Sequence, residues 1–125
     1  ADALKDELDS YCLPGVAFRT IHYKPTAGSS SGKLIHGVQY FYTDYGAAQI
    51  SLTQFYVMQA LHRLYPARNP FTMASGRTAM FDKVCGTDYV RKTFSERLEV
   101  SDIVDYWTKD VEAFKALSRK YHLYK

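Results

Sequence analysis

The chain has 125 residues, a formal net charge of +3 and a hydrophobic content of 46%. This length suits one globular domain with its own core, and excludes a second full domain or a scaffold that depends on disulfides. The mild charge, with acidic residues between the basic ones, argues against a nucleic-acid-binding protein, and no apolar run approaches the ~20 residues of a membrane span. The 11 tyrosines and 7 phenylalanines are typical of a half-buried sheet face or of a surface that binds a sugar.

The first part of the chain predicts a helix followed by two strands. Apolar residues from Asp2 onward recur at helical spacing until Leu13-Pro14-Gly15, which ends the helix. Val16 to Tyr23 and His36 to Thr43 are rich in β-branched and aromatic residues, as strands are, and a Gly- and Ser-rich loop separates them. On the second strand we expect three side chains to share one face: Val38, Tyr40 and Tyr42.

The rest of the chain is predicted to be helical around one long connection, Pro66 to Met80. Ser51-Leu52-Thr53-Gln54 has the pattern of a capping box and begins an apolar stripe that ends before that connection. Gly86-Thr87 indicates a turn and an N-cap, and a last helix is expected from Ser101 to Leu117. The final residues, from His122, either add an edge strand or pack back. The elements together predict a single α+β domain over the whole chain, with a small β-sheet covered by about four helices.

Several sites are excluded by their spacing. The loop Ala27–Lys33 lacks the first glycine of a phosphate-binding loop, and Leu34 stands where its hydroxyl residue belongs. The histidines have no spacing that would place two on one metal, and we expect no metal and no cofactor. Cys12 and Cys85 fit either two buried free thiols or one disulfide.

A pair of catalytic carboxyl groups cannot be assigned from the sequence. A glycosidase needs two such groups at a set separation, one of them held protonated. The candidates are four aspartates, of which only Asp82 lacks an evident structural role: Asp44, Asp82, Asp88 and Asp105. We therefore predict no catalytic residue in this chain.

The order of the motifs resembles the C-terminal domain of the YbbC-like family of peptidoglycan exo-β-N-acetylmuramidases, the NamZ type. The likeness spans nearly the whole chain and ends in a tail with Trp107, Asp110, Phe114 and the tyrosines Tyr121 and Tyr124 in the family's order. Three earlier segments carry it: Leu13–Arg19 leading to Pro25-Thr26; Gly37-Val38-Gln39 with Thr43-Asp44; and Phe81–Thr87 with Arg91.

This resemblance implies that the chain is half of an enzyme and is inactive alone. A Rossmann-like N-terminal domain of the same polypeptide would hold the catalytic Glu, and the substrate, a peptidoglycan fragment or muropeptide, would lie in a cleft between the domains. The reaction would release a terminal N-acetylmuramic acid, and the location would be exported, periplasmic or at the cell surface. From motif position and chemistry, the predicted substrate-binding residues are Tyr23, Lys24, Lys33, His36, Asp82 and Arg91.

A non-catalytic carbohydrate- or protein-interaction module is the alternative function. The tyrosine-rich strands favour it, through Tyr23, Tyr40 and Tyr42. A nucleic-acid module fits less well, because no basic groove accompanies the tyrosines.

Overall fold

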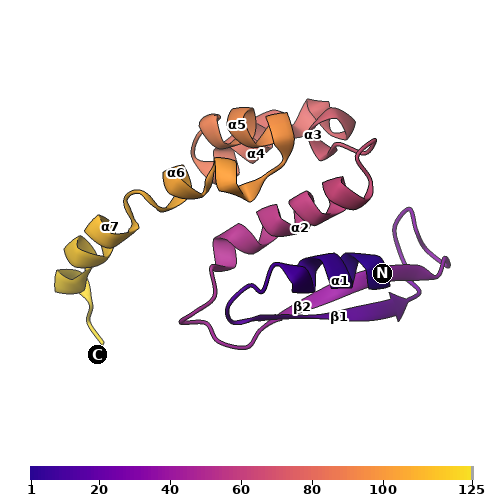
Figure 1. Ribbon diagram of the computed structural model, residues 1–125, viewed down its shortest axis with the longest axis horizontal. Helices are drawn as coiled ribbons and strands as arrows, with labels where there is room; N and C mark the ends of the chain where they lie inside the picture. Colours follow the sequence, from indigo (N-terminus) through magenta and orange to yellow (C-terminus); the bar gives the residue numbers. More distant parts are fainter. Residues whose placement is uncertain (125) are drawn as a thin grey trace. The chain divides into compact units, whose positions relative to one another are not determined.

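The computed structural model describes residues 1–124 and has an α+β fold, as the sequence predicts. The chain divides into two compact units, Ala1–Pro70 and a second that starts at Phe71. The first unit contains a helix, a two-stranded antiparallel sheet and a long helix (Figure 1). These elements are α1 (Asp2–Ser10), β1 (Val16–Tyr23), β2 (Ile35–Tyr42) and α2 (Ile50–Leu64).

The hairpin follows the predicted pattern closely. β1 has the expected bounds, and β2 begins and ends one residue earlier than expected, because Ile35 pairs with Tyr23 to close the ladder. In this register Phe18 lies opposite Tyr40 and Val16 opposite Tyr42, so the even-numbered side chains of both strands share one face. That arrangement confirms the predicted common face of Val38, Tyr40 and Tyr42.

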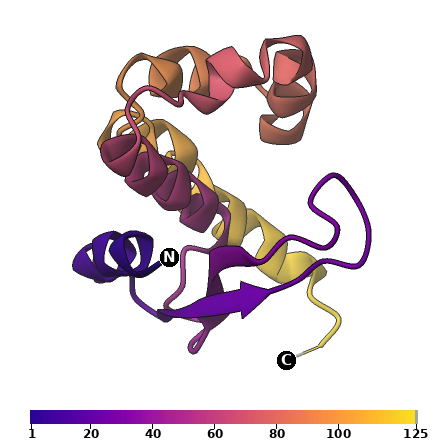
Figure 2. The ribbon, with the colours of Figure 1, turned by 90° about the vertical axis from the view of Figure 1, so that its right-hand side faces the viewer.

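Helix α1 lies over the even-numbered face of the hairpin (Figures 1 and 2). The buried cluster of this unit contains Leu8 of α1, Phe18 of β1 and Ala60 of α2. Partly buried apolar side chains surround the cluster, among them Leu4, Val38 and Val57. The odd-numbered face of the hairpin carries Arg19, whose guanidinium donates to Gln39 Oε1 at 2.8 and 3.0 Å and lies 4.8 Å from the centre of the Phe41 ring.

Gly15 joins α1 to β1 in a conformation that favours glycine. Its φ is +67°, in the left-handed region, and a Cβ at this position would lie 2.3 Å from the carbonyl oxygen of Asp44. The Gly15 carbonyl accepts a hydrogen bond from the backbone N–H of Thr43 at 2.8 Å. The Pro14-Gly15 turn is thus bonded to the residue that follows β2.

Helix α2 forms where the apolar stripe predicts it, but without the expected capping box. The helix begins at Ile50, so Ser51 lies inside its first turn, and the N-cap residue Gln49 makes no side-chain capping bond. The helix ends at Leu64, two residues before Pro66. Leu52 and Phe55 are fully buried on its apolar stripe.

The segment predicted as a long connection contains helical turns. Pro70 starts a short helix, as proline can because its missing N–H has no partner in a first turn. The elements here are α3 (Pro70–Met73), a 3₁₀ turn η1 (Ser75–Arg77) and the start of α4 (Thr78–Cys85). Gly86 then ends α4 with a φ of +72°, which confirms the predicted turn before α5 (Tyr89–Arg97).

The predicted last helix is divided into shorter pieces. The chain forms η2 (Val100–Asp102), α6 (Val104–Thr108), α7 (Val111–Ser118) and η3 (Arg119–Tyr121). The buried apolar side chains of the second unit are Val90, Phe94, Leu98, Val100 and Ile103. His122 to Tyr124 form no strand, and Lys125 lies outside the described residues. Within residues 1–124, no helix has the length and apolar character that a bilayer span requires.

Candidate functional site

The strands end in a loop that is ordered by its own hydrogen bonds. The loop connects Tyr23 to Ile35, and it closes where the Gly32 N–H donates to the Pro25 carbonyl at 2.9 Å. The Ser31 hydroxyl donates to the Thr26 carbonyl at 3.0 Å. Because these donors bond within the loop and the loop joins two strands, it does not form a phosphate-binding cradle at a helix N-terminus.

Two histidines form the last cross-strand pair before this loop on the even-numbered face. The Nδ1 atoms of His22 and His36 lie 2.6 Å apart, and the rings meet edge to face with their centres 4.7 Å apart. A hydrogen bond between them requires one Nδ1 to donate its N–H and the other Nδ1 to accept it. Both rings are on exposed residues and can offer their Nε2 atoms to a ligand.

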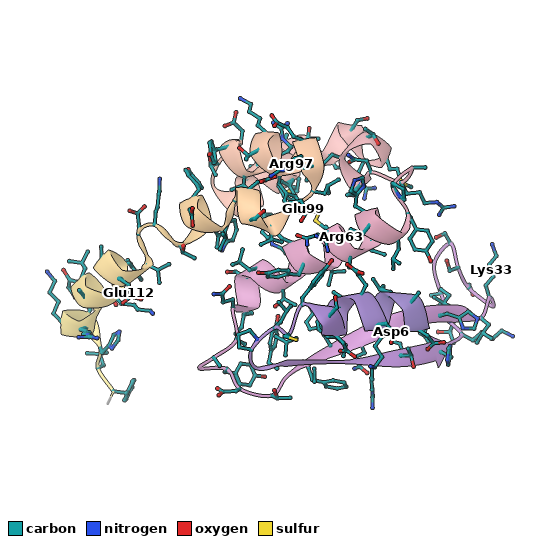
Figure 3. All side chains as sticks on the ribbon, in the orientation of Figure 1. Asp6, Lys33, Arg63, Arg97, Glu99 and Glu112 are labelled. Carbon is teal, nitrogen blue, oxygen red and sulfur yellow. The ribbon has the colours of Figure 1, made fainter. Side chains whose placement is uncertain are left out.

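Two lysines and a tyrosine extend the polar surface at the same end of the hairpin. Lys24 follows β1, and Lys33 lies on the loop two residues before β2 (Figure 3). Both are exposed, and neither forms an ion pair with another residue of the part of the chain that the structure describes. Tyr23 is 50% exposed. Since Tyr23 pairs with Ile35, its ring lies on the face opposite to His36.

The structure therefore gathers four predicted residues at one end of the hairpin: Tyr23, Lys24, Lys33 and His36. Free ammonium groups there can bind an anion, a tyrosine ring can stack on a sugar, and imidazole nitrogens can bond hydroxyl groups. We call these four residues, together with His22, the hairpin-end cluster. It suits a polar, anionic ligand with ring hydroxyls.

The other two predicted residues bind one another in the second unit. Arg91 on α5 donates from Nε to Asp82 Oδ1 at 2.7 Å and from Nη2 to Asp82 Oδ2 at 2.9 Å. The hydrogen bond to Asp82 raises the pKa of Arg91. Burial, and then the charge of Asp82, raise the pKa of the nearby Cys85 thiol. Asp82 and Arg91 thus have a structural role that joins α4 to α5.

Two of the other candidate carboxylates, Asp44 and Asp88, also have structural partners. Asp44 Oδ1 accepts the N–H groups of Gly46 and Ala47 in the turn after β2, at 2.8 and 3.2 Å. Asp88 pairs with Lys92 on α5, and this ion pair lowers the pKa of Asp88. Within residues 1–124, no group of three or more His, Cys, Asp or Glu side chains could hold a metal ion. Both cysteines are free thiols, Cys12 exposed and Cys85 partly buried.

Sequence reasoning missed His22 as a member of the hairpin-end cluster. In a hairpin closed by Tyr23 and Ile35, His22 and His36 are direct neighbours across the strands. Correct strand bounds would therefore have predicted this pair. The structure also extends the predicted pair of Tyr40 and Tyr42 into a row of tyrosine rings that includes Tyr45. Tyr42 lies 5.6 Å from Tyr40 and 5.8 Å from Tyr45, centre to centre, while Tyr23 lies on the opposite face.

Comparison with known proteins identifies the family. Residues 1–124 match the family described as exo-beta-N-acetylmuramidase NamZ, C-terminal. The peptidoglycan beta-N-acetylmuramidase NamZ of Bacillus subtilis (strain 168) is 32% identical over 121 residues, which are 97% of this chain and 28% of that protein. A crystal structure of a DUF1343 family protein from Bacteroides fragilis has a TM-score of 0.92 and 44% identity to this chain.

The match covers 100% of this chain and 33% of the Bacteroides fragilis chain. The chain thus spans about a third of the length of both relatives. The family match over nearly every residue agrees with the resemblance that the motifs suggest. The chain belongs to the family of NamZ C-terminal domains.

Proposed function

We propose that this chain is the substrate-facing C-terminal domain of an exo-β-N-acetylmuramidase that acts on peptidoglycan fragments. The family match over residues 1–124 carries the proposal. An N-terminal Rossmann-like domain of the same polypeptide supplies the catalytic groups, and the two domains form the substrate cleft. The relative named as a peptidoglycan beta-N-acetylmuramidase, of which this chain spans 28%, supports the proposed activity and the presence of further domains in the complete enzyme. We place the enzyme in an exported compartment, where its polymer substrate lies.

The hairpin-end cluster supplies groups that suit this substrate. Muramic acid carries a lactyl carboxylate, and Lys24 and Lys33 present ammonium groups that make no ion pair within residues 1–124. His36 can bond a sugar hydroxyl on the even-numbered face of the hairpin, and the half-exposed ring of Tyr23 is available to a sugar on the opposite face. On this proposal the C-terminal domain binds and orients the terminal sugar, and the chemistry takes place on the other domain.

We assign Asp82 and Arg91 a structural role and not a sugar-binding one. Two hydrogen bonds already join these side chains, so a sugar that took the place of either partner would break an existing pair. Their pair holds α4 against α5. Whether Arg91 also contacts the substrate is measured with the Arg91→Ala variant below.

The test measures release of muramic acid from a chromogenic N-acetylmuramoside by the complete polypeptide. The Lys33→Ala/His36→Ala variant should lower kcat/KM by about tenfold or more, the effect of removing about 1.4 kcal/mol of binding. Lys83→Ala, which removes an exposed lysine on α4, is the matched control and should leave kcat/KM unchanged. Arg91→Ala is measured separately. Equal activity of the wild type and the double variant would reject the cluster as a sugar-binding site.

A carbohydrate-interaction module is the second candidate, favoured by the row Tyr40, Tyr42 and Tyr45. Tyr40 is 49% exposed and Tyr45 is 72% exposed, so both rings are accessible to a sugar. If this row binds sugar by itself, muropeptide titration of the 125-residue chain should shift the amide signals of β2. Shifts confined to the loop between β1 and β2 would instead favour the hairpin-end cluster.

A further inference from the structure

The C-terminal part of the chain exposes a contiguous apolar surface. On α7, Val111, Phe114 and Leu117 recur every three residues, and Tyr121 on η3 follows four residues after Leu117. Phe114 is 67% exposed, Leu117 55% and Tyr121 70%. Glu112, labelled on α7 in Figure 3, pairs with Lys115, so the same helix also has a charged side. This is the pattern of an amphipathic helix whose apolar side lacks a cover among the described residues of the second unit.

A hollow extends this surface toward α6. It has a volume of about 500 Å³ and is lined by the aromatic and aliphatic side chains of Tyr106, Trp107, Val111 and Phe114 together with charged residues. Lys109 Nζ lies 4.1 Å from the centre of the Tyr106 ring, at the border of the hollow. The hollow thus has an apolar floor with charged groups around it, which is the composition of a docking surface.

Helix α7 has eight residues, and within the described chain its main contact is η3, the turn that follows it. A helix of this length is marginal in water unless its apolar side packs against another structure. The surface formed by Val111, Phe114, Leu117 and Tyr121, which we call the α7 surface, is therefore suited to a partner.

We propose that the α7 surface docks onto the polypeptide that precedes this chain in the complete enzyme. This inference rests on the two-domain organisation of the proposed function. The matched family is that of a C-terminal domain, and the chain spans 28% of one relative and 33% of another, so the larger part of such a protein lies before residue 1. A partner on the same polypeptide is held near the surface by the covalent link and docks at high effective concentration, unlike a second copy.

The test is hydrogen–deuterium exchange of the complete polypeptide without substrate, at several protein concentrations. The backbone of α7 should exchange at least about tenfold more slowly than a helix that only frays in solvent, and the protection should be independent of concentration. Phe114→Asp should abolish this protection and raise exchange in a segment before residue 1. Ala116→Asp places the same charge on the opposite side of α7, since two residues advance a helix by more than half a turn, and should keep the protection.

Three results would overturn the proposal. They are fast exchange of α7 in the wild type, protection that appears only as the protein dimerises, and equal effects of Phe114→Asp and Ala116→Asp. Muramoside hydrolysis by the Lys33→Ala/His36→Ala variant is read separately. If the variant loses hydrolysis but α7 of the wild type exchanges fast, the docking alone is refuted. If α7 of the wild type is protected but the variant hydrolyses the muramoside normally, the sugar contacts alone are refuted.

Discussion

Gly15 offers a sharp test of how the first unit is held together. In Gly15→Ala the new Cβ would lie 2.3 Å from the Asp44 carbonyl oxygen and 3.1 Å from the Ala48 nitrogen. The first distance is far inside the ~3.5 Å of an ordinary contact, so the backbone must move. That movement strains two hydrogen bonds, from Thr43 N–H to the Gly15 carbonyl at 2.8 Å and from Ala48 N–H to the Asp44 carbonyl at 3.0 Å.

Gly86→Ala is the matched control, because it measures how much free energy of unfolding is lost through the left-handed backbone conformation alone. Gly86 has a φ of +72°, close to the +67° of Gly15, but a Cβ added to Gly86 would have no heavy atom within 4 Å outside its immediate chain neighbours. The left-handed conformation alone costs an alanine about 1–2 kcal/mol. Each of the two strained hydrogen bonds adds about 1 kcal/mol for Gly15→Ala. We therefore expect a loss of about 3–4 kcal/mol for Gly15→Ala and about 1–2 kcal/mol for the control.

Urea denaturation followed by far-UV circular dichroism measures both losses through the shift of the midpoint at constant slope. The ordering of the two variants is the critical result. Equal midpoints for Gly15→Ala and Gly86→Ala would refute the claim that the Pro14-Gly15 turn packs tightly against the residues after β2.

Three further predictions concern single side chains. Burial, and then its hydrogen bond to Glu7, raise the pKa of Tyr11 to about 12. Because the folded protein favours the neutral phenol, Tyr11 contributes about 1–2 kcal/mol to the free energy of unfolding below pH 10. This contribution is lost as the pH rises through 12. Tyr11→Phe should flatten the stability profile over that range, and an unchanged slope would contradict the assignment. Phe94→Ala should cost about 3–5 kcal/mol in urea denaturation, because this fully buried ring leaves a cavity, and a loss below about 1 kcal/mol would contradict its place in the core. Iodoacetamide at about pH 8 should alkylate the exposed Cys12 faster than Cys85, whose pKa is raised, as peptide mass spectrometry would show; equal rates would contradict this.

The hairpin was predictable because its signals are local. Alternation and the residue types fix β1 at Val16–Tyr23, and Pro14-Gly15 fixes the turn before it. The sequence pattern could not show the division of the last predicted helix, because apolar residues keep helical spacing on both sides of Lys109 and Asp110. In the structure the Thr108 hydroxyl donates to the Val104 carbonyl at 2.8 Å, and Asp110 starts α7 afresh.

The candidate site was predictable in part for the same reason. Tyr23 and Lys24 follow a strand, and Lys33 and His36 flank the start of the next, so a hairpin brings them to one end. The pair of Asp82 and Arg91 depends on the angle between α4 and α5 across the turn at Gly86. The sequence pattern does not specify that angle, so the hydrogen bonds between Asp82 and Arg91 could not be predicted from it.

The central claim is that the hairpin-end cluster binds the lactyl carboxylate of muramic acid. The most direct measurement compares kcat/KM of the complete polypeptide for a chromogenic N-acetylmuramoside and for its lactyl methyl ester, which lacks the negative charge. The wild type should prefer the charged substrate, and Lys24→Ala/Lys33→Ala should reduce that preference by about tenfold or more, as expected from losing charge-assisted hydrogen bonds of about 1.5–3 kcal/mol. A preference that is the same in the wild type and in this double variant would contradict the claim.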